Sequence, residues 1–220
     1  MLRDALHSAR PFVKVCGLTR IDDLELCAKA GADAAGIVRY EHSPRHVGDE
    51  KLCELGPAAR ELGLSPILVT LGITPAEAEE LALQAGLLGV QLCGDEDPSQ
   101  WEDFSLPLLR RVGVAPGAQR EFERWKNVAS AFVLDAPGSP GGSGQTVDQE
   151  LATALASGGP SLLAGGLDGP RVASLSAPLR EALIGYDASS RLEDTPGSKC
   201  EIRVRAFVDA ARHTHPAPRK

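Results

Sequence analysis

The chain has 220 residues, of which 43% are hydrophobic, and a formal net charge of −7 at pH 7. This apolar content is enough for a full core, and the acidic balance argues against nucleic acid or an anionic membrane surface as the main partner. No apolar run approaches the roughly 20 residues that span a bilayer, and residues 1–10 lack a signal-peptide core, so we expect a cytoplasmic protein. The five cysteines form no CxxC pair, so they indicate neither a zinc site nor a disulfide framework.

Short apolar segments alternate with amphipathic segments along nearly the whole chain. Strands are expected at residues 12–16, 34–38, 65–71, 87–92, 107–114, 131–135, 161–164 and 183–186. Helices are expected at residues 22–30 (with Thr19 as N-cap), 49–62, 75–85, 98–104, 119–126, 170–176 and 201–212, with another helix start at Asp148. Eight such units predict a closed (β/α)8 TIM barrel rather than an open doubly wound sheet. Because no linker-like segment divides the chain, we expect one domain over residues 1–220, with a core at about 12–212 and frayed ends.

One glycine-rich stretch follows the sixth expected strand, from Asp135 to Asp148. A carboxylate at the end of a buried strand is costly unless it has a partner or a task. The segment Gly142, Ser143 and Gly144 offers backbone N–H groups with little side-chain obstruction, which suits an anion such as phosphate. The alternative interpretation is an ordinary surface loop.

The functional residues of a TIM barrel lie at the carboxyl ends of its strands. Here the first strand ends in Cys16, the second leads to Arg45 and the sixth ends in Asp135. The seventh and eighth lead to small and polar residues at the usual phosphate position of this fold: Gly165, Gly166, Asp187, Ser189 and Ser190. These residue types predict an acid/base pocket for a phosphorylated small molecule. The alternatives are that Cys16 is a small core residue and Arg45 a solvated one.

Several stretches carry a family resemblance, in order along the chain: KVCGLT at 14–19, GADAAG at 31–36, SPR at 43–45, VQL at 90–92, LD at 134–135, GGSG at 141–144, AGGL at 164–167 and DASS at 187–190. Together they resemble the phosphoribosylanthranilate isomerase family of tryptophan biosynthesis. The resemblance implies a TIM-barrel isomerase that catalyses the Amadori rearrangement of N-(5-phosphoribosyl)anthranilate to 1-(2-carboxyphenylamino)-1-deoxyribulose 5-phosphate, with neither metal nor cofactor.

The resemblance also implies roles for individual residues. Cys16 is the general base and Asp135 the general acid, while Arg45 holds the anthranilate carboxylate through its forked guanidinium. The phosphate is expected on N–H groups of Gly142, Ser143, Gly144, Gly166, Ser189 and Ser190, and Gly165 and Asp187 complete the substrate-binding set.

The residue types suit this chemistry. Opening the furanose ring requires a proton on the ring oxygen, which Asp135 delivers only while protonated, and burial beside a phosphate is expected to raise its pKa. Removing the proton from C2 requires a base, and a Cys16 thiolate serves if its pKa is lowered.

Two departures from the family pattern bear on the substrate site. Cys93 stands where the family usually has His, and Arg191 where it has Gly, so the eighth loop is either reshaped or uses the Arg191 charge on the phosphate. A related phosphate-binding isomerase or lyase for another sugar phosphate remains an alternative. So does a barrel that binds a ligand without turnover, although an acid/base pair disfavours it. A monomer and a homodimer are both compatible with the sequence.

Overall fold

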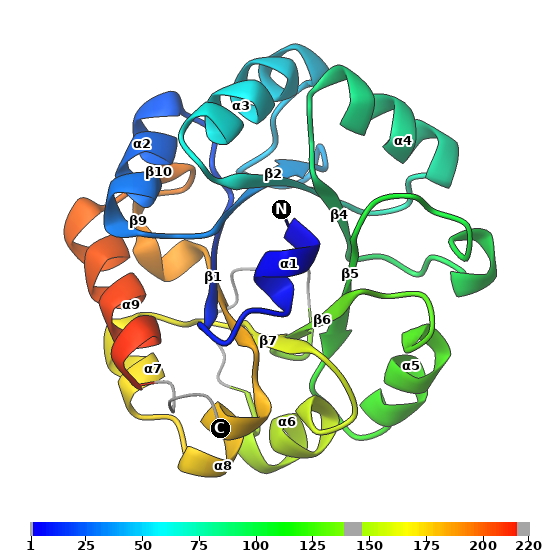
Figure 1. Ribbon diagram of the computed structural model, residues 1–220, viewed down its shortest axis with the longest axis vertical. Helices are drawn as coiled ribbons and strands as arrows, with labels where there is room; N and C mark the ends of the chain where they lie inside the picture. The colour runs from blue at the N-terminus through cyan, green and yellow to red at the C-terminus, as the bar shows by residue number, and fades with distance from the viewer. Residues whose placement is uncertain (1, 139–146, 215–220) are drawn as a thin grey trace.

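Eight parallel strands close into a barrel in chain order, with β1 paired to both β2 and β8 (Figure 1). The structure is a computed structural model that describes residues 2–138 and 147–214. The barrel strands are β1 (Phe12–Cys16), β2 (Ala34–Arg39), β3 (Ser65–Thr70), β4 (Gly89–Leu92), β5 (Leu108–Gly113), β6 (Ala131–Asp135), β7 (Ser161–Leu163) and β8 (Gly185–Ala188). The predicted (β/α)8 barrel is therefore confirmed.

Helices surround the barrel on its outer face (Figure 1). They are α2 (Ile21–Ala30), α3 (Asp49–Glu61), α4 (Pro75–Gln84), α5 (Ala118–Trp125), α6 (Gln149–Ala156), α7 (Gly169–Ala173), α8 (Ala177–Ala182) and α9 (Glu201–Thr214), with short 3-10 turns η1 (Pro98–Gln100) and η2 (Ser190–Leu192). The helix start predicted at Asp148 is confirmed, because its side chain accepts hydrogen bonds from two N–H groups of α6. In the described part of the chain, no helix is long and apolar enough to cross a membrane.

Two predicted helices differ from the structure. The segment 98–104 forms only the turn η1, since so short a stretch gains too few hydrogen bonds to offset helix nucleation. The segment 170–176 is replaced by α7 and α8, and the second of these starts after Ser176 with a proline in its first turn.

The expectation that both ends are frayed is wrong at the N-terminus. Residues Leu2–Leu6 form helix α1, which lies within the ring of strands (Figure 1). Leu2 and Leu6 are buried with Phe12 in the cluster inside the barrel. A Cβ atom on Gly89, at the start of β4, would lie 2.6 Å from Leu2 Cδ2, so a larger residue there would displace the Leu2 side chain. The α1 side chains thus close the end of the barrel opposite the strand carboxyl ends.

A hairpin that the sequence reasoning missed follows η2, and consists of β9 (Glu193–Thr195) and β10 (Ser198–Lys199). It also explains why the predicted N-cap is wrong. Helix α2 has Arg20 as its N-cap, without a side-chain cap, while the Thr19 hydroxyl donates to the carbonyl of Gly197 at 2.7 Å. The hairpin is therefore tied to the loop that follows β1.

Alternation along the strands decides which side chains enter the barrel. On β1, Val13 and Val15 pack in the layer between strands and helices, whereas Phe12 belongs to the inner cluster. Lys14 and Cys16 share the face of Phe12, because successive side chains of a strand point to opposite sides. Inward-facing polar residues therefore accumulate above Phe12, toward the carboxyl ends of the strands.

Candidate active site

A hollow opens at the carboxyl ends of the barrel strands. Its lining includes these residues predicted from the sequence: Cys16, Arg45, Asp135, Gly165, Gly166, Asp187, Ser189 and Ser190. They come from β1, β6 and β8 and from the loops after β2, β7 and β8. The predicted Gly142, Ser143 and Gly144 lie outside the described residues. The carboxyl ends of the barrel strands therefore bring together segments that are far apart in the chain, as expected for this fold.

A buried ion pair lies below this hollow. Lys14 Nζ is 2.7 Å from Asp187 Oδ2, and the two residues are register partners on β1 and β8. Burial alone would lower the pKa of Lys14, but the Asp187 carboxylate outweighs it and raises that pKa. The second oxygen, Asp187 Oδ1, is buried and has no hydrogen-bond partner among the described residues. Thus only one of the two carboxylate oxygens of Asp187 is paired with Lys14. No role was expected for Lys14 from the sequence.

The Cys16 thiol lies close to this pair. A Cβ atom on Gly36 would be 2.8 Å from Cys16 Sγ and 3.0 Å from Lys14 Nζ, so both atoms approach the same point on β2. Burial raises the pKa of Cys16, while the Lys14 ammonium acts in the opposite direction. A general base at this position was expected to have a lowered thiol pKa. In the free protein burial outweighs the nearby cations, so the neutral thiol is favoured.

Asp135 is held by a second residue that the sequence reasoning missed. Its Oδ2 accepts from Arg111 Nε at 2.8 Å, and its Oδ1 accepts from the N–H of Ala136 at 2.8 Å. Arg111 comes from β5 and also lines the hollow. The available signal was the Arg110-Arg111 pair in an expected strand, because alternation directs one of two adjacent side chains into the barrel.

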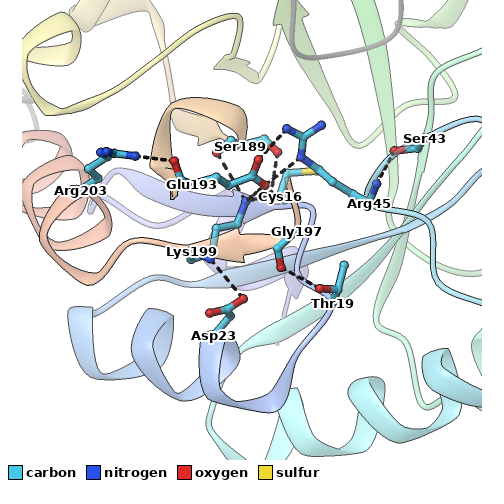
Figure 2. A network of polar contacts seen from close by, with 10 residues as sticks. All are labelled: Cys16, Thr19, Asp23, Ser43, Arg45, Ser189, Glu193, Gly197, Lys199 and Arg203. Carbon is cyan, nitrogen blue, oxygen red and sulfur yellow. Dashed lines mark hydrogen bonds and ion pairs between the residues drawn. The ribbon is translucent and has the colours of Figure 1, made fainter. Parts of the chain in front are cut away.

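Arg45 is part of a polar network at the rim (Figure 2). Its Nε and Nη2 donate to the two oxygens of Glu193 at 2.8 and 2.6 Å. Lys199 Nζ lies 2.6 Å from the same carboxylate. Glu193 and Lys199 belong to the hairpin β9–β10, which no expected element covered. Burial works against ionisation of Glu193, but the two cations outweigh it and hold its pKa below the usual range.

Another part of the lining is built from small residues. Gly165 and Gly166 have φ of 81° and 63°, the left-handed region that favours glycine. A Cβ on Gly165 would lie 2.8 Å from the backbone nitrogen of Ala136, so this loop packs directly against the residue after Asp135. Ser189 and Ser190 extend the wall, and the Ser189 hydroxyl donates to the carbonyl of Cys16 at 2.9 Å.

The two departures from the family pattern both line this hollow. No non-glycine residue in the described part of the chain has a positive φ, so Arg191 occupies its position without that strain. Its Nη1 lies 3.5 Å from Asp168 Oδ2, while its buried Nε has no hydrogen-bond partner among the described residues. Burial raises the pKa of Cys93 to about 12, so this thiol stays neutral near pH 7. Within the described ranges, no group of three or more His, Cys, Asp or Glu side chains is placed to hold a metal ion.

The family model and the relatives that match this chain carry the same family name. The model of the N-(5'-phosphoribosyl)anthranilate (PRA) isomerase family matches residues 13–210. An N-(5'-phosphoribosyl)anthranilate isomerase of Rubrobacter xylanophilus is 38% identical over 206 residues, covering 91% of this chain and 98% of that protein. Another, from Leptothrix cholodnii, is 35% identical over 211 residues, covering 94% of this chain and 93% of that protein.

Solved structures agree with these relatives. The phosphoribosyl anthranilate isomerase from Thermus thermophilus is 29% identical with a TM-score of 0.76, covering 90% of this chain and 97% of that one. The corresponding structure from Thermotoga maritima is 26% identical with a TM-score of 0.81, covering 91% of this chain and 98% of that one. The chain therefore belongs to the N-(5'-phosphoribosyl)anthranilate isomerase family.

Proposed function

We propose that the chain catalyses the Amadori rearrangement of N-(5-phosphoribosyl)anthranilate in tryptophan biosynthesis, with Cys16 as general base and Asp135 as general acid. The observation that carries the assignment of these roles is that both residues line the same hollow, together with the small residues of the loops after β7 and β8. An acid, a base and an anion-binding wall around one cavity are the parts that this isomerisation needs.

The reaction begins with ring opening. Protonated Asp135 gives its proton to the furanose ring oxygen, the bond from C1 to that oxygen breaks, and the nitrogen lone pair forms a protonated imine. Arg111, at 2.8 Å, stabilises the carboxylate that Asp135 becomes. The guanidinium thus acts on the charge that develops during proton transfer.

The second step removes the proton from C2. The Cys16 thiolate takes this proton, and the electron pair forms the C1–C2 double bond and neutralises the imine. Burial disfavours the thiolate in the free protein, but the positive charge of the imine beside the sulfur favours it. Lys14 adds a second positive charge from below. Return of a proton to C1 and loss of the enol proton give the ketose and restore both residues.

Substrate binding involves the rest of the lining. Arg45 provides the cationic fork for the anthranilate carboxylate. Gly166, Ser189 and Ser190, with Gly142, Ser143 and Gly144, supply backbone N–H groups to the phosphate. Gly165 and Asp187 complete the site. Asp187 contributes through Oδ1, the carboxylate oxygen that is not paired with Lys14. This arrangement supports the isomerase over a barrel that only binds a ligand, because binding alone does not require an acid opposite a base.

Loss of substrate fluorescence on mixing with N-(5-phosphoribosyl)anthranilate measures turnover directly. We expect Cys16→Ala and Asp135→Asn each to lower kcat by about 100-fold or more, the usual contribution of general acid–base catalysis. Cys93→Ala is the matched control, since Cys93 is a second thiol that lines the same hollow and has no proposed part in the proton transfers. Wild-type kcat in both Cys16→Ala and Asp135→Asn would remove the proposed roles, and absence of turnover by the unmodified protein would remove the activity.

A further inference from the structure

We propose that Glu193, which is itself held by Lys199, is a positioning residue for Arg45. It accepts hydrogen bonds from one edge of the Arg45 guanidinium and so orients the other edge of that guanidinium toward the substrate carboxylate. This inference rests on the proposed function, because it assumes that Arg45 binds that carboxylate. Its evidence is separate, since it comes from the rim network of Figure 2. That network joins the loop after β2 to the hairpin β9–β10.

The geometry of the pair leaves part of the fork available. A guanidinium carries five N–H donors in one plane. Glu193 takes one from Nε and one from Nη2, at 2.8 and 2.6 Å, which is the side-on arrangement. Nη1 makes no hydrogen bond to any residue in the described ranges, so the end of the fork, Nη1 with the second donor of Nη2, remains for a ligand. Arg45 itself lines the hollow.

The charges of the cluster favour an anion at that end. Glu193 contributes one negative charge, and the two cations in contact with it contribute two positive charges. All three donors of Lys199 Nζ are occupied by Glu193 at 2.6 Å and by the carbonyls of Cys16 at 2.7 Å and Ser189 at 3.4 Å. The unbalanced positive charge is therefore accessible at Arg45, where a substrate carboxylate would neutralise it.

The network also fixes the position of Glu193. Its side chain is 3% exposed, and Arg203 donates to its backbone carbonyl. The stem of Arg45 crosses Gly17, where any Cβ atom would overlap Arg45 Cδ. Both ends of the pair are thus held before a ligand arrives, so Arg45 has less rotamer freedom to lose on binding. The expected benefit is tighter substrate binding rather than faster chemistry.

The test compares KM and kcat of Glu193→Gln for two substrates, N-(5-phosphoribosyl)anthranilate and the aniline analogue that lacks the carboxylate. With the true substrate we expect KM to rise about tenfold, as for loss of one charge-assisted contact, with little change in kcat. With the aniline analogue we expect no difference from the unmodified protein. A merely structural role of Glu193 would affect both substrates alike.

Arg45→Lys tests the same idea without altering Glu193 or Lys199, and so covers failure of Glu193→Gln to fold. Lysine keeps the charge but lacks the planar fork, so it cannot form a side-on pair with Glu193 and present a second two-donor edge to the substrate carboxylate. We therefore expect Arg45→Lys to raise KM nearly as much as Arg45→Ala, again only for the substrate with a carboxylate. Asp49→Asn is the matched control, because Asp49 forms a similar forked pair with Arg39 on exposed surface near the same loop.

The outcomes separate the inference from the function. Unmodified protein that does not turn over N-(5-phosphoribosyl)anthranilate overturns the proposed function. Turnover with a raised KM in Arg45→Ala, but with an unchanged or lowered KM in Glu193→Gln, overturns only the positioning role. In that case Glu193 competes for the guanidinium rather than orienting it. An unchanged KM in Arg45→Lys likewise rules out the proposal that the guanidinium binds Glu193 with one edge and the substrate carboxylate with the other.

Discussion

Arg111 Nε lies 2.8 Å from Asp135 Oδ2. Arg111 also donates to the carbonyls of Ala136 at 3.3 Å and Gly138 at 3.4 Å, so one guanidinium holds the carboxylate and the chain that follows it. The proposed acid is therefore fixed from the neighbouring strand, rather than only by its own strand end.

The first prediction concerns the adjacent arginines of β5. Arg111→Ala should lower kcat about tenfold, because the Asp135 carboxylate loses the group that positions it and the positive charge that stabilises it. The effect should be smaller than loss of the general acid, because Asp135 itself is retained. Arg110 points the other way, to Glu96 and Glu121 at 2.7 Å each. Arg110→Ala should therefore cost about 3 kcal/mol of stability by breaking a buried pair while leaving kcat near that of the unmodified protein. Steady-state kinetics and urea unfolding of both variants decide whether the two effects separate in this way.

A second prediction uses two glycines with similar backbone angles. Gly165 and Gly63 have φ of 81° and 80°, but only a Cβ on Gly165 meets neighbours, at 2.8 Å from Ala136 N and 3.0 Å from Asp135 Oδ1. Each change to alanine should cost about 1 kcal/mol for the left-handed backbone. Gly165→Ala should in addition lower kcat/KM at least about tenfold by displacing the acid. Equal kcat/KM in the two variants would show that the contact with Asp135 is without consequence.

The third prediction is a pH dependence of stability from Glu193. Its pKa lies below the ordinary value because Arg45 and Lys199 outweigh the effect of burial. A lowered carboxyl pKa stabilises the fold at pH values above the unfolded pKa of about 4.3, and this contribution is lost as the pH falls through the lower folded pKa. Glu193→Gln should therefore cost about 2 kcal/mol at neutral pH, with the difference shrinking as the solution is acidified.

Urea unfolding of this variant and the unmodified protein at several pH values measures the difference. Asp49→Asn serves as the reference, since an exposed pair contributes about 0–1 kcal/mol. A gap between Glu193→Gln and the unmodified protein that widened in acid would contradict the sign.

The fourth prediction concerns the closed end of the barrel. Leu6 of α1 is 2% exposed and packs in the inner cluster. Leu6→Ala should cost about 2–5 kcal/mol of stability, as buried leucine truncations do, without raising KM. Leu83 on α4 is 85% exposed, so Leu83→Ala should change stability by less than about 0.5 kcal/mol. Thermal unfolding that did not distinguish the two variants would mean that α1 contributes nothing to the fold.

Much of the architecture follows from the sequence alone. Eight short apolar segments separated by amphipathic ones can bury their faces only as a parallel sheet covered by helices, and this number of strands closes a barrel. Cys16 and Asp135 could be singled out because each is a chemically capable residue at a strand end. The short helix α1 lacked such a signal, because two leucines in five residues establish no period.

The tertiary structure decided which charges meet. Lys14 pairs with Asp187, 173 positions away, and Arg45 with Glu193, 148 positions away. Nothing local in the chain fixes these partners, because a buried charge is satisfied by whatever group barrel closure brings beside it. Likewise, a one-residue shift of β5 would exchange the faces of Arg110 and Arg111. The sequence therefore determined the barrel and the rim on which the reactive groups stand, while the closure of β8 against β1 and the register of β5 decided which partners hold them.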